Sequence, residues 1–111
     1  MRLLVAVLLA AFMLAGAAAA TTPPPKYGNA KNGRKLFIAH DCGACHLMAA
    51  ANALSPSGIG PDLDTSTKSY TAIVANITKG GKGMTGYRKT LTTTQILDLA
   101  TFVYKTSLTH R

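Results

Sequence analysis

The sequence predicts an all-α domain with long loops, and three observations support that fold class. Apolar residues recur at helical spacing in three separate segments, and no segment alternates apolar and polar residues as a half-buried strand does. Stretches rich in Gly, Pro, Ser and Ala separate the helical segments. Long loops leave few residues for a packed core in a chain of 111 residues, so we expect another group to fill the interior.

The first twenty residues are predicted to be a signal peptide, residues 1–20. Arg2 supplies a positive start, Leu3 to Leu14 is continuously apolar, and Ala18 to Ala20 fits a signal peptidase site. An uncleaved membrane anchor is the alternative, because the apolar stretch approaches the length that spans a bilayer. Its second half is mostly Ala and Gly, which favours cleavage. We expect export to a periplasm in preference to a thylakoid lumen, and no stable membrane insertion after cleavage.

A short linker and a first helix are predicted to follow the leader. Residues 21–28 form the linker, and Pro23 to Pro25 stiffen it. Asn29 is a suitable N-cap for a helix that runs to about His40. The apolar residues of this helix are Leu36, Phe37 and Ile38.

Two further helices are predicted beyond a long loop over residues 47–69. One spans residues 70–79 and ends at Gly80-Gly81. After a second loop at residues 83–89, Thr92 to Thr94 offer a cap for the last helix. The apolar faces of these two helices consist of Ile73, Val74 and Ile77 in the first, and of Ile96, Leu97, Leu99, Ala100, Phe102 and Val103 in the second.

The charge of the chain favours an acidic protein partner. There are 12 Lys and Arg against 4 Asp and Glu, which is a formal net charge of +8. The basic residues are scattered from Lys26 to Arg111, without a basic run or interleaved aromatic residues. We therefore expect no binding of nucleic acid.

The chemistry is predicted to lie in the segment Cys42-Gly43-Ala44-Cys45-His46. The spacing C-x-x-C-H is the attachment signature for c-type haem. On a helical turn the two cysteines share one face, so both sulfurs can form thioethers with the vinyl groups of one porphyrin edge. The small Gly43 and Ala44 let that edge approach the backbone. His46 follows directly, and its Nε2 can bind the iron. We therefore predict one covalently attached haem c.

Three other kinds of site use similar residues. A thioredoxin-like dithiol needs a βαβ context, which this sequence lacks. A structural zinc needs four ligands, whereas only Cys42, Cys45 and His46 cluster here. A plain structural disulfide is the third alternative in an exported protein.

The second axial ligand has four candidates, namely His40, Met48, Met84 and His110. Met48 and His40 lie too close to His46 in sequence to reach the opposite haem face, and His110 lies near a chain end expected to fray. Met84 lies in the glycine-rich segment 80–87, whose backbone can lie close over a flat ring. The alternative is that Met84 fills a core gap, but a lone Met between glycines fills cores poorly. We therefore predict Met84 as the ligand, because it combines sufficient distance from His46 along the chain with a glycine-rich loop. His/Met ligation raises the reduction potential and suits electron transfer.

These residues resemble the class I cytochrome c family, in its short bacterial and photosynthetic forms, over nearly all of the chain after the leader. Gly33 to Phe37 resembles the first-helix segment of that family, and Gly60 to Leu63 resembles its G-P-x-L segment. Gly83-Met84 is similar to the axial methionine loop, and Leu99 to Val103 to the aromatic segment of the last helix.

The resemblance implies a cytochrome c domain over residues 29–111, with three to five helices wrapped around one covalently bound haem and joined by long loops. It also implies that the Pro61 carbonyl accepts the proton of His46. A glycine at Gly33 would allow the first helix to cross the last one closely, near Leu99 and Phe102.

The sequence departs from the family pattern at two places. Thr85 stands where the family usually has proline after the ligand methionine, so the stiffness of the loop is in question. The last helix starts with Thr92 to Gln95, without the usual acidic residues, which weakens the favourable electrostatics of its N-terminus by some tenths of a kcal/mol.

The expected function is that of a soluble, exported, monomeric electron carrier without enzyme activity, moving one electron at a time between larger redox partners. Lys82, Arg88 and Lys89 beside the methionine loop are expected to steer the protein to an acidic partner, unless they form only a solvated face. A small haem c subunit of a dehydrogenase or oxidase complex is the alternative. A ligand sensor or peroxidase is a third class, but no distal His or Arg obviously supports it.

Overall fold

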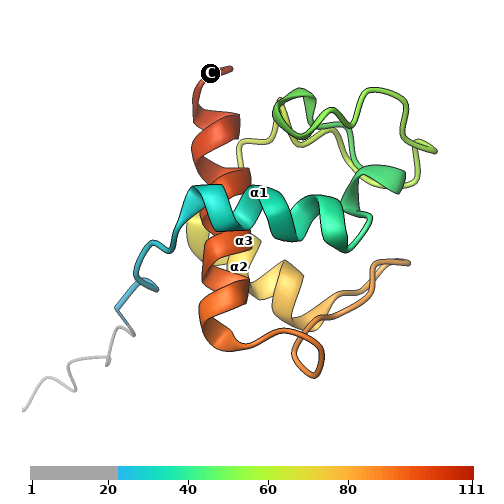
Figure 1. The fold of residues 1–111 in the computed structure, drawn as a ribbon. Helices are drawn as coiled ribbons and strands as arrows, with labels where there is room; N and C mark the ends of the chain where they lie inside the picture. The colour runs from blue at the N-terminus through green and yellow to red at the C-terminus, as the bar shows by residue number, and fades with distance from the viewer. Residues whose placement is uncertain (1–22) are drawn as a thin grey trace, which may run out of the picture.

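The computed structural model describes residues 23–111, so the predicted signal peptide lies outside the described residues (Figure 1). Three α-helices follow one another: α1 (Ala30–Ala39), α2 (Tyr70–Lys79) and α3 (Thr93–Leu108). Two short 3-10 helices, η1 (Cys42–Ala44) and η2 (Ala49–Ala51), lie between α1 and α2. No strand occurs among residues 23–111, and the all-α prediction with long loops is confirmed.

The first helix begins and ends where the sequence predicts. The side chain of Asn29 caps it by accepting a hydrogen bond of 2.9 Å from the backbone N–H of Asn32. The helix ends at Ala39, and His40 is its C-cap. Gly33 and Phe37 are its buried residues, and both lie on the side that faces α3.

The second and third helices also form as predicted, and each begins at a hydroxyl cap. The α2 helix follows Ser69, which accepts from the N–H of Ala72, and ends at Gly80 with a φ of 66°. The α3 helix follows Thr92, which forms a capping box with Gln95 through hydrogen bonds of 3.1 and 2.9 Å. This reciprocal pair satisfies two N–H groups and offsets the missing acidic residues at the start of α3.

The close crossing of α1 over α3 depends on Gly33 (Figure 1). A Cβ atom at this position would collide with the backbone carbonyl of Asp98 and lie 2.7 Å from the Cβ of Phe102. The rings of Phe37 and Phe102 then meet edge to face, with centroids 5.7 Å apart. The predicted role of Gly33 therefore agrees with the structure, and Asp98 joins Phe102 as its nearest neighbour.

One continuous core lies between the three helices and the loop after η1. The apolar face predicted for α3 is buried, apart from the half-buried Leu97. The buried apolar residues are Phe37, Met48, Ala51, Tyr70, Ile73, Ile77, Leu91, Ile96, Leu99, Ala100, Phe102 and Val103.

The residues just before α1 are tied to the other two helices. The N–H of Gly28 donates to Thr101 Oγ1, and the N–H of Asn29 donates to Asp98 Oδ1, both at 2.7 Å. The hydroxyl of Tyr70 donates to the carbonyl of Lys26, also at 2.7 Å. Asp98 and Thr101 are buried, so these bonds satisfy polar groups that water does not reach. The segment 26–29 therefore packs as part of the helical domain.

None of the helices within residues 23–111 combines the length and apolar character needed to cross a membrane.

Candidate functional site

The turn after α1 places the two cysteines one helical turn apart. Asp41 adopts the left-handed conformation, with a φ of 54°, and redirects the chain into η1. The N–H groups of Cys45 and His46 both donate to the carbonyl of Cys42, at 3.2 and 3.0 Å. Cys42 and Cys45 are half-buried and are not joined in a disulfide. Their spacing leaves both thiols on one side of the turn, as the sequence predicts.

The ring of His46 is fixed by the segment Gly60-Pro61. Nδ1 of His46 lies 2.8 Å from the carbonyl oxygen of Pro61. A carbonyl oxygen can only accept, so the proton is on Nδ1 and the lone pair of the neutral ring is on Nε2. The structure thus brings Pro61 and His46 together in the arrangement that the resemblance implied.

Gly60 is a site residue that the sequence analysis did not single out. A Cβ atom there would lie 2.6 Å from Nδ1 of His46 and 2.9 Å from the carbonyl oxygen of Cys45. The N–H of Gly60 donates to that same carbonyl at 3.0 Å. The backbone therefore passes directly against the imidazole, which only glycine permits. Its position beside Pro61 in the G-P-x-L segment was the available sequence signal.

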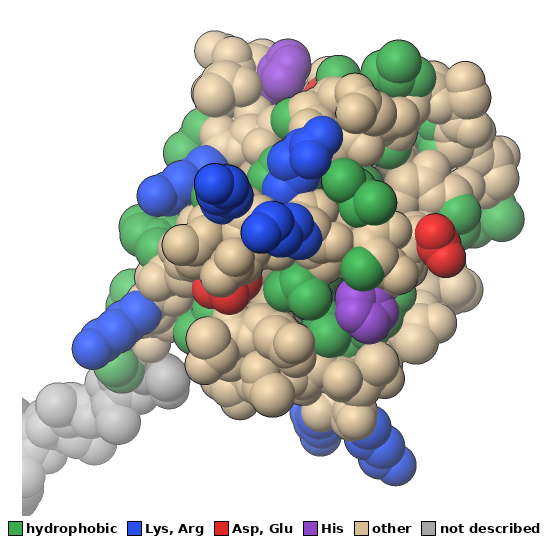
Figure 2. Space-filling view, in the orientation of Figure 1, with side chains coloured by type: hydrophobic (Ala, Val, Ile, Leu, Met, Phe, Trp, Pro, Cys, Tyr) green, Lys and Arg blue, Asp and Glu red, His purple; other side chains and the backbone are tan. Residues whose placement is uncertain are grey.

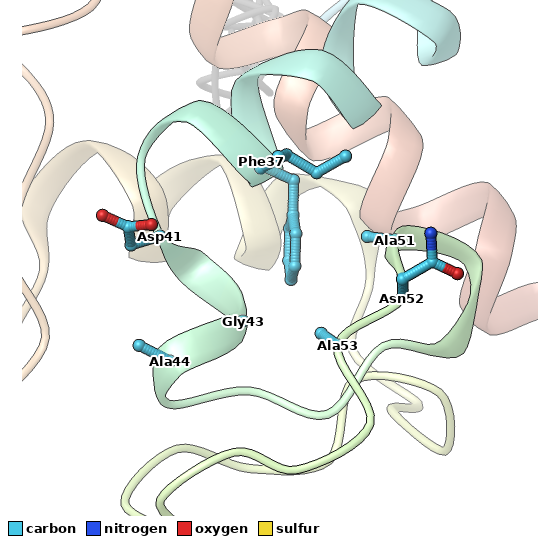
Figure 3. A pocket seen from close by; sticks show the side chains of 8 residues that line it. Phe37, Asp41, Gly43, Ala44, Ala51, Asn52 and Ala53 are labelled. Atoms are coloured by element: carbon cyan, nitrogen blue, oxygen red, sulfur yellow. The ribbon is translucent and has the colours of Figure 1, made fainter.

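Gly43 is small for a packing reason that the sequence did not reveal. A Cβ atom at Gly43 would lie 2.7 Å from the Cβ of Ala53 and 3.6 Å from Cε1 of Phe37. Figure 3 shows Phe37 between the turn of Asp41 to Ala44 and the segment around Ala53, beside a cavity of about 220 Å³. One side of the cysteine turn is therefore covered by the chain itself.

Met48 belongs to the core. Its side chain is fully buried, with 0 % of its surface exposed. Its backbone pairs with Ala53 through hydrogen bonds of 3.0 and 3.1 Å, which close the loop around η2. Asp64 caps this loop by accepting from the N–H of Ala49 at 3.0 Å. The predicted exclusion of Met48 thus acquires a structural reason.

The glycine-rich segment 80–87, called the methionine loop, contains a turn that is closed by backbone hydrogen bonds, although Thr85 stands where the family usually has proline. Gly81 and Met84 exchange two backbone hydrogen bonds of 2.9 and 3.1 Å. Beyond the loop, the N–H of Tyr87 donates to the carbonyl of Ile77 at 2.9 Å, so the chain returns along the end of α2. Backbone hydrogen bonds therefore close this turn without a proline at position 85.

Met84 contacts the edge of the core but remains partly exposed. It differs in this from Met48, whose side chain is sealed in the interior. The two histidine candidates have other neighbours. The ring of His40 packs edge-on against Tyr87, and Nδ1 of His110 lies 3.1 Å from the carbonyl of Thr106 at the end of α3.

The protonation of Cys42 separates this site from a reactive dithiol. Burial raises the pKa of the Cys42 thiol to about 11, so the thiol is protonated at neutral pH. A dithiol of the thioredoxin kind needs a thiolate nucleophile. Within residues 23–111, no three His, Cys, Asp or Glu side chains are grouped as ligands of a metal ion.

The donor set fits a haem. Two unpaired thiols one turn apart are followed by an imidazole whose lone pair is held on Nε2 by its partner Pro61. The thioether of Met84 is partly exposed and lies in the methionine loop. Figure 1 shows this loop on the same side of the helices as the cysteine turn. Haem iron takes such a nitrogen and sulfur pair as axial ligands.

The helical fold and the thiol–imidazole turn together define a c-type cytochrome domain of the class I kind. The chain belongs to the family described as cytochrome c oxidase, cbb3-type, subunit III, which it matches over residues 28–103. This match includes Cys42, Cys45, His46, Pro61 and Met84. No curated protein and no solved structure matches the chain. The cytochrome c domain carries out electron transfer by means of haem.

Proposed function

We propose that this protein carries single electrons through one haem c that is attached to Cys42 and Cys45 and ligated by His46 and Met84. The haem would supply the one-electron Fe(III)/Fe(II) couple. The observation that supports the proposal best is the hydrogen bond of 2.8 Å between Nδ1 of His46 and the carbonyl of Pro61, because it leaves Nε2 as the ligating nitrogen.

The protein side chains set the properties of this couple. The hydrogen bond from Nδ1 to Pro61 orients the ring of His46 and raises its basicity as a ligand. The thioether of Met84 favours the ferrous state and so raises the reduction potential. If His46 and Met84 both hold the iron, no coordination position would be left for a substrate, and we propose a carrier without enzyme activity.

The partner is proposed to dock beside the methionine loop, with acidic groups of its own facing the basic residues of this protein. Lys82, Arg88 and Lys89 are exposed, and a hollow of about 380 Å³ is lined by Lys79, Arg88 and Lys89. No carboxylate lines this hollow. Figure 2 shows that Lys and Arg side chains also gather over the face that carries α1, where Lys31 and Lys35 are exposed. Such a surface attracts an acidic partner and speeds its encounter.

We further propose that the protein is exported to the periplasm and acts there as a soluble monomer. The proposed signal peptide supports this location, because a haem-attachment sequence follows it in the same chain.

A subunit of an oxidase complex is the second candidate, and the family description favours it because it names an oxidase subunit. The two candidates differ in how the protein purifies from its natural host. A carrier is recovered from the periplasmic fraction as a single chain. A subunit is recovered from the membrane fraction together with larger chains.

The central experiment is to express the full chain together with haem-attachment machinery. The intact mass of the exported protein should exceed that of the mature polypeptide by one haem, whereas a Cys42→Ala, Cys45→Ala control should carry none covalently. A redox titration should give a single one-electron wave. The ferric protein should show the weak far-red sulfur-to-iron charge-transfer band of His/Met ligation. A mass equal to the bare polypeptide would refute the proposal.

A further inference from the structure

Tyr87 lies where the methionine loop meets the cysteine turn. It follows Met84 by three residues, and its ring packs edge-on against His40 with centroids 5.6 Å apart and an interplanar angle of 79°. The pKa of Tyr87 is raised by burial first and then by the nearby Cys42, Asp41 and Cys45. The ring of Tyr87 therefore contacts the C-cap residue of α1, which stands two positions before Cys42.

The backbone of Tyr87 is held by hydrogen bonds to α2 and to the segment that precedes α3. Its N–H donates to the carbonyl of Ile77 in α2 at 2.9 Å. Its carbonyl accepts from the N–H groups of Thr90 and Leu91, at 3.1 and 2.9 Å. Leu91 is buried in the core, so this backbone position is firmly placed.

Tyr87 connects two segments that are carried by different helices. The cysteine turn packs on α1, the methionine loop follows α2, and both helices pack on α3. A side chain whose backbone is fixed beside α2 and whose ring contacts the end of α1 restrains the separation of these two segments. Such a contact favours a closed arrangement of the loop.

We propose that Tyr87 is a positioning residue that latches the methionine loop to the cysteine turn and so keeps Met84 on the iron. The inference rests on the proposed function, because it requires Met84 to be a haem ligand. The ring makes the contact with His40, so the latch depends on the aromatic ring and not on the hydroxyl. Losing one aromatic contact should shift the balance between closed and open loop by about two- to tenfold.

The test compares haem-loaded Tyr87→Ala, Tyr87→Phe and wild type. Imidazole is titrated into the ferric protein, and loss of the far-red sulfur-to-iron band reports displacement of Met84. Tyr87→Ala should bind imidazole about two- to tenfold more tightly, because its loop opens more often. Tyr87→Phe keeps the ring and should stay within about twofold of wild type.

A second measurement uses trypsin and no added molecule that binds the iron. Lys82 is exposed at the tip of the methionine loop, so trypsin cleavage after Lys82 follows the population of the open loop. Cleavage should be faster in Tyr87→Ala by about the same factor. Should Tyr87→Ala fail to fold with haem, Tyr87→Leu keeps an apolar side chain at this position and carries the same expectation.

Tyr104→Ala is the matched control. Tyr104 is also a half-buried tyrosine, but it packs on Tyr27 and Tyr70 and not on the methionine loop. It should lower stability without changing imidazole affinity. An equal gain in affinity in Tyr104→Ala, or none in Tyr87→Ala, would overturn the latch. A wild-type protein without the far-red band would instead overturn the proposed ligation by Met84, and with it the latch.

Discussion

Replacing Gly33 tests the helix crossing on which the whole site depends. In an exposed helix interior, Gly→Ala stabilises by about 1 kcal/mol, because glycine loses more backbone entropy on folding. At Gly33 the sign should reverse. The new Cβ would collide with the backbone carbonyl of Asp98 and lie 2.6 Å from its carbonyl carbon. A backbone atom of α3 cannot turn away as a flexible side chain can, so the two helices must separate.

The magnitude follows from the size of the clash. Ordinary contacts of a Cβ begin at 3.4 Å, whereas the Cβ of Phe102 would be only 2.7 Å away, so α1 must shift by several tenths of an ångström or more. Overpacking of this kind costs about 1–3 kcal/mol. The shift also loosens the edge-to-face contact between Phe37 and Phe102. We expect Gly33→Val to lower the free energy of unfolding by about 1–3 kcal/mol, which is about 4–20 °C in Tm for a domain of this size.

Guanidinium unfolding of the haem-loaded protein, followed by circular dichroism, measures this loss. Ala39→Val is the matched control, because Ala39 is exposed on the same helix and its substitution costs only helix propensity, at most about 0.7 kcal/mol. If Gly33→Val unfolds at the same denaturant concentration as wild type, the helices do not cross at this residue and the packing argument is wrong.

Three further outcomes are expected. Gly60→Ala should press on the ring of His46 and weaken its hydrogen bond to the Pro61 carbonyl. The substitution should lower the free energy of unfolding by about 1–3 kcal/mol and raise the reduction potential, which denaturant unfolding and redox titration measure. An unchanged potential would contradict the proposed support of His46. Met84→Ala should abolish the far-red band and lower the reduction potential. Met48→Ala should keep the band and lower the free energy of unfolding by about 2–5 kcal/mol. The reverse pattern would make Met48 the iron ligand and Met84 the core residue. N-terminal sequencing of the exported protein should begin at or near residue 21, and a sequence beginning at residue 1 would favour a membrane anchor.

The sequence by itself determined the local structure and the chemistry of the haem turn. Asn29 caps α1, Gly80 ends α2 and Thr92 caps α3, because capping depends on a side chain and on backbone groups a few residues away. The spacing of Cys42 and Cys45 is equally local, since one turn of backbone places both thiols on one face. The resemblance to class I cytochromes added Pro61 and the crossing at Gly33, and the structure bears out both contacts.

Only the tertiary structure decided which distant residues support these elements. The hydrogen bond between Asn29 and Asp98 joins positions 69 residues apart, and the ring of Tyr87, beyond the end of α2, contacts His40 at the end of α1. The reason for glycine at position 43 is likewise the approach of Ala53. Periodicity and capping reveal which face of a segment is apolar and where a helix starts. They do not reveal the path of the chain between helices, and that path determines which polar and aromatic side chains come into contact.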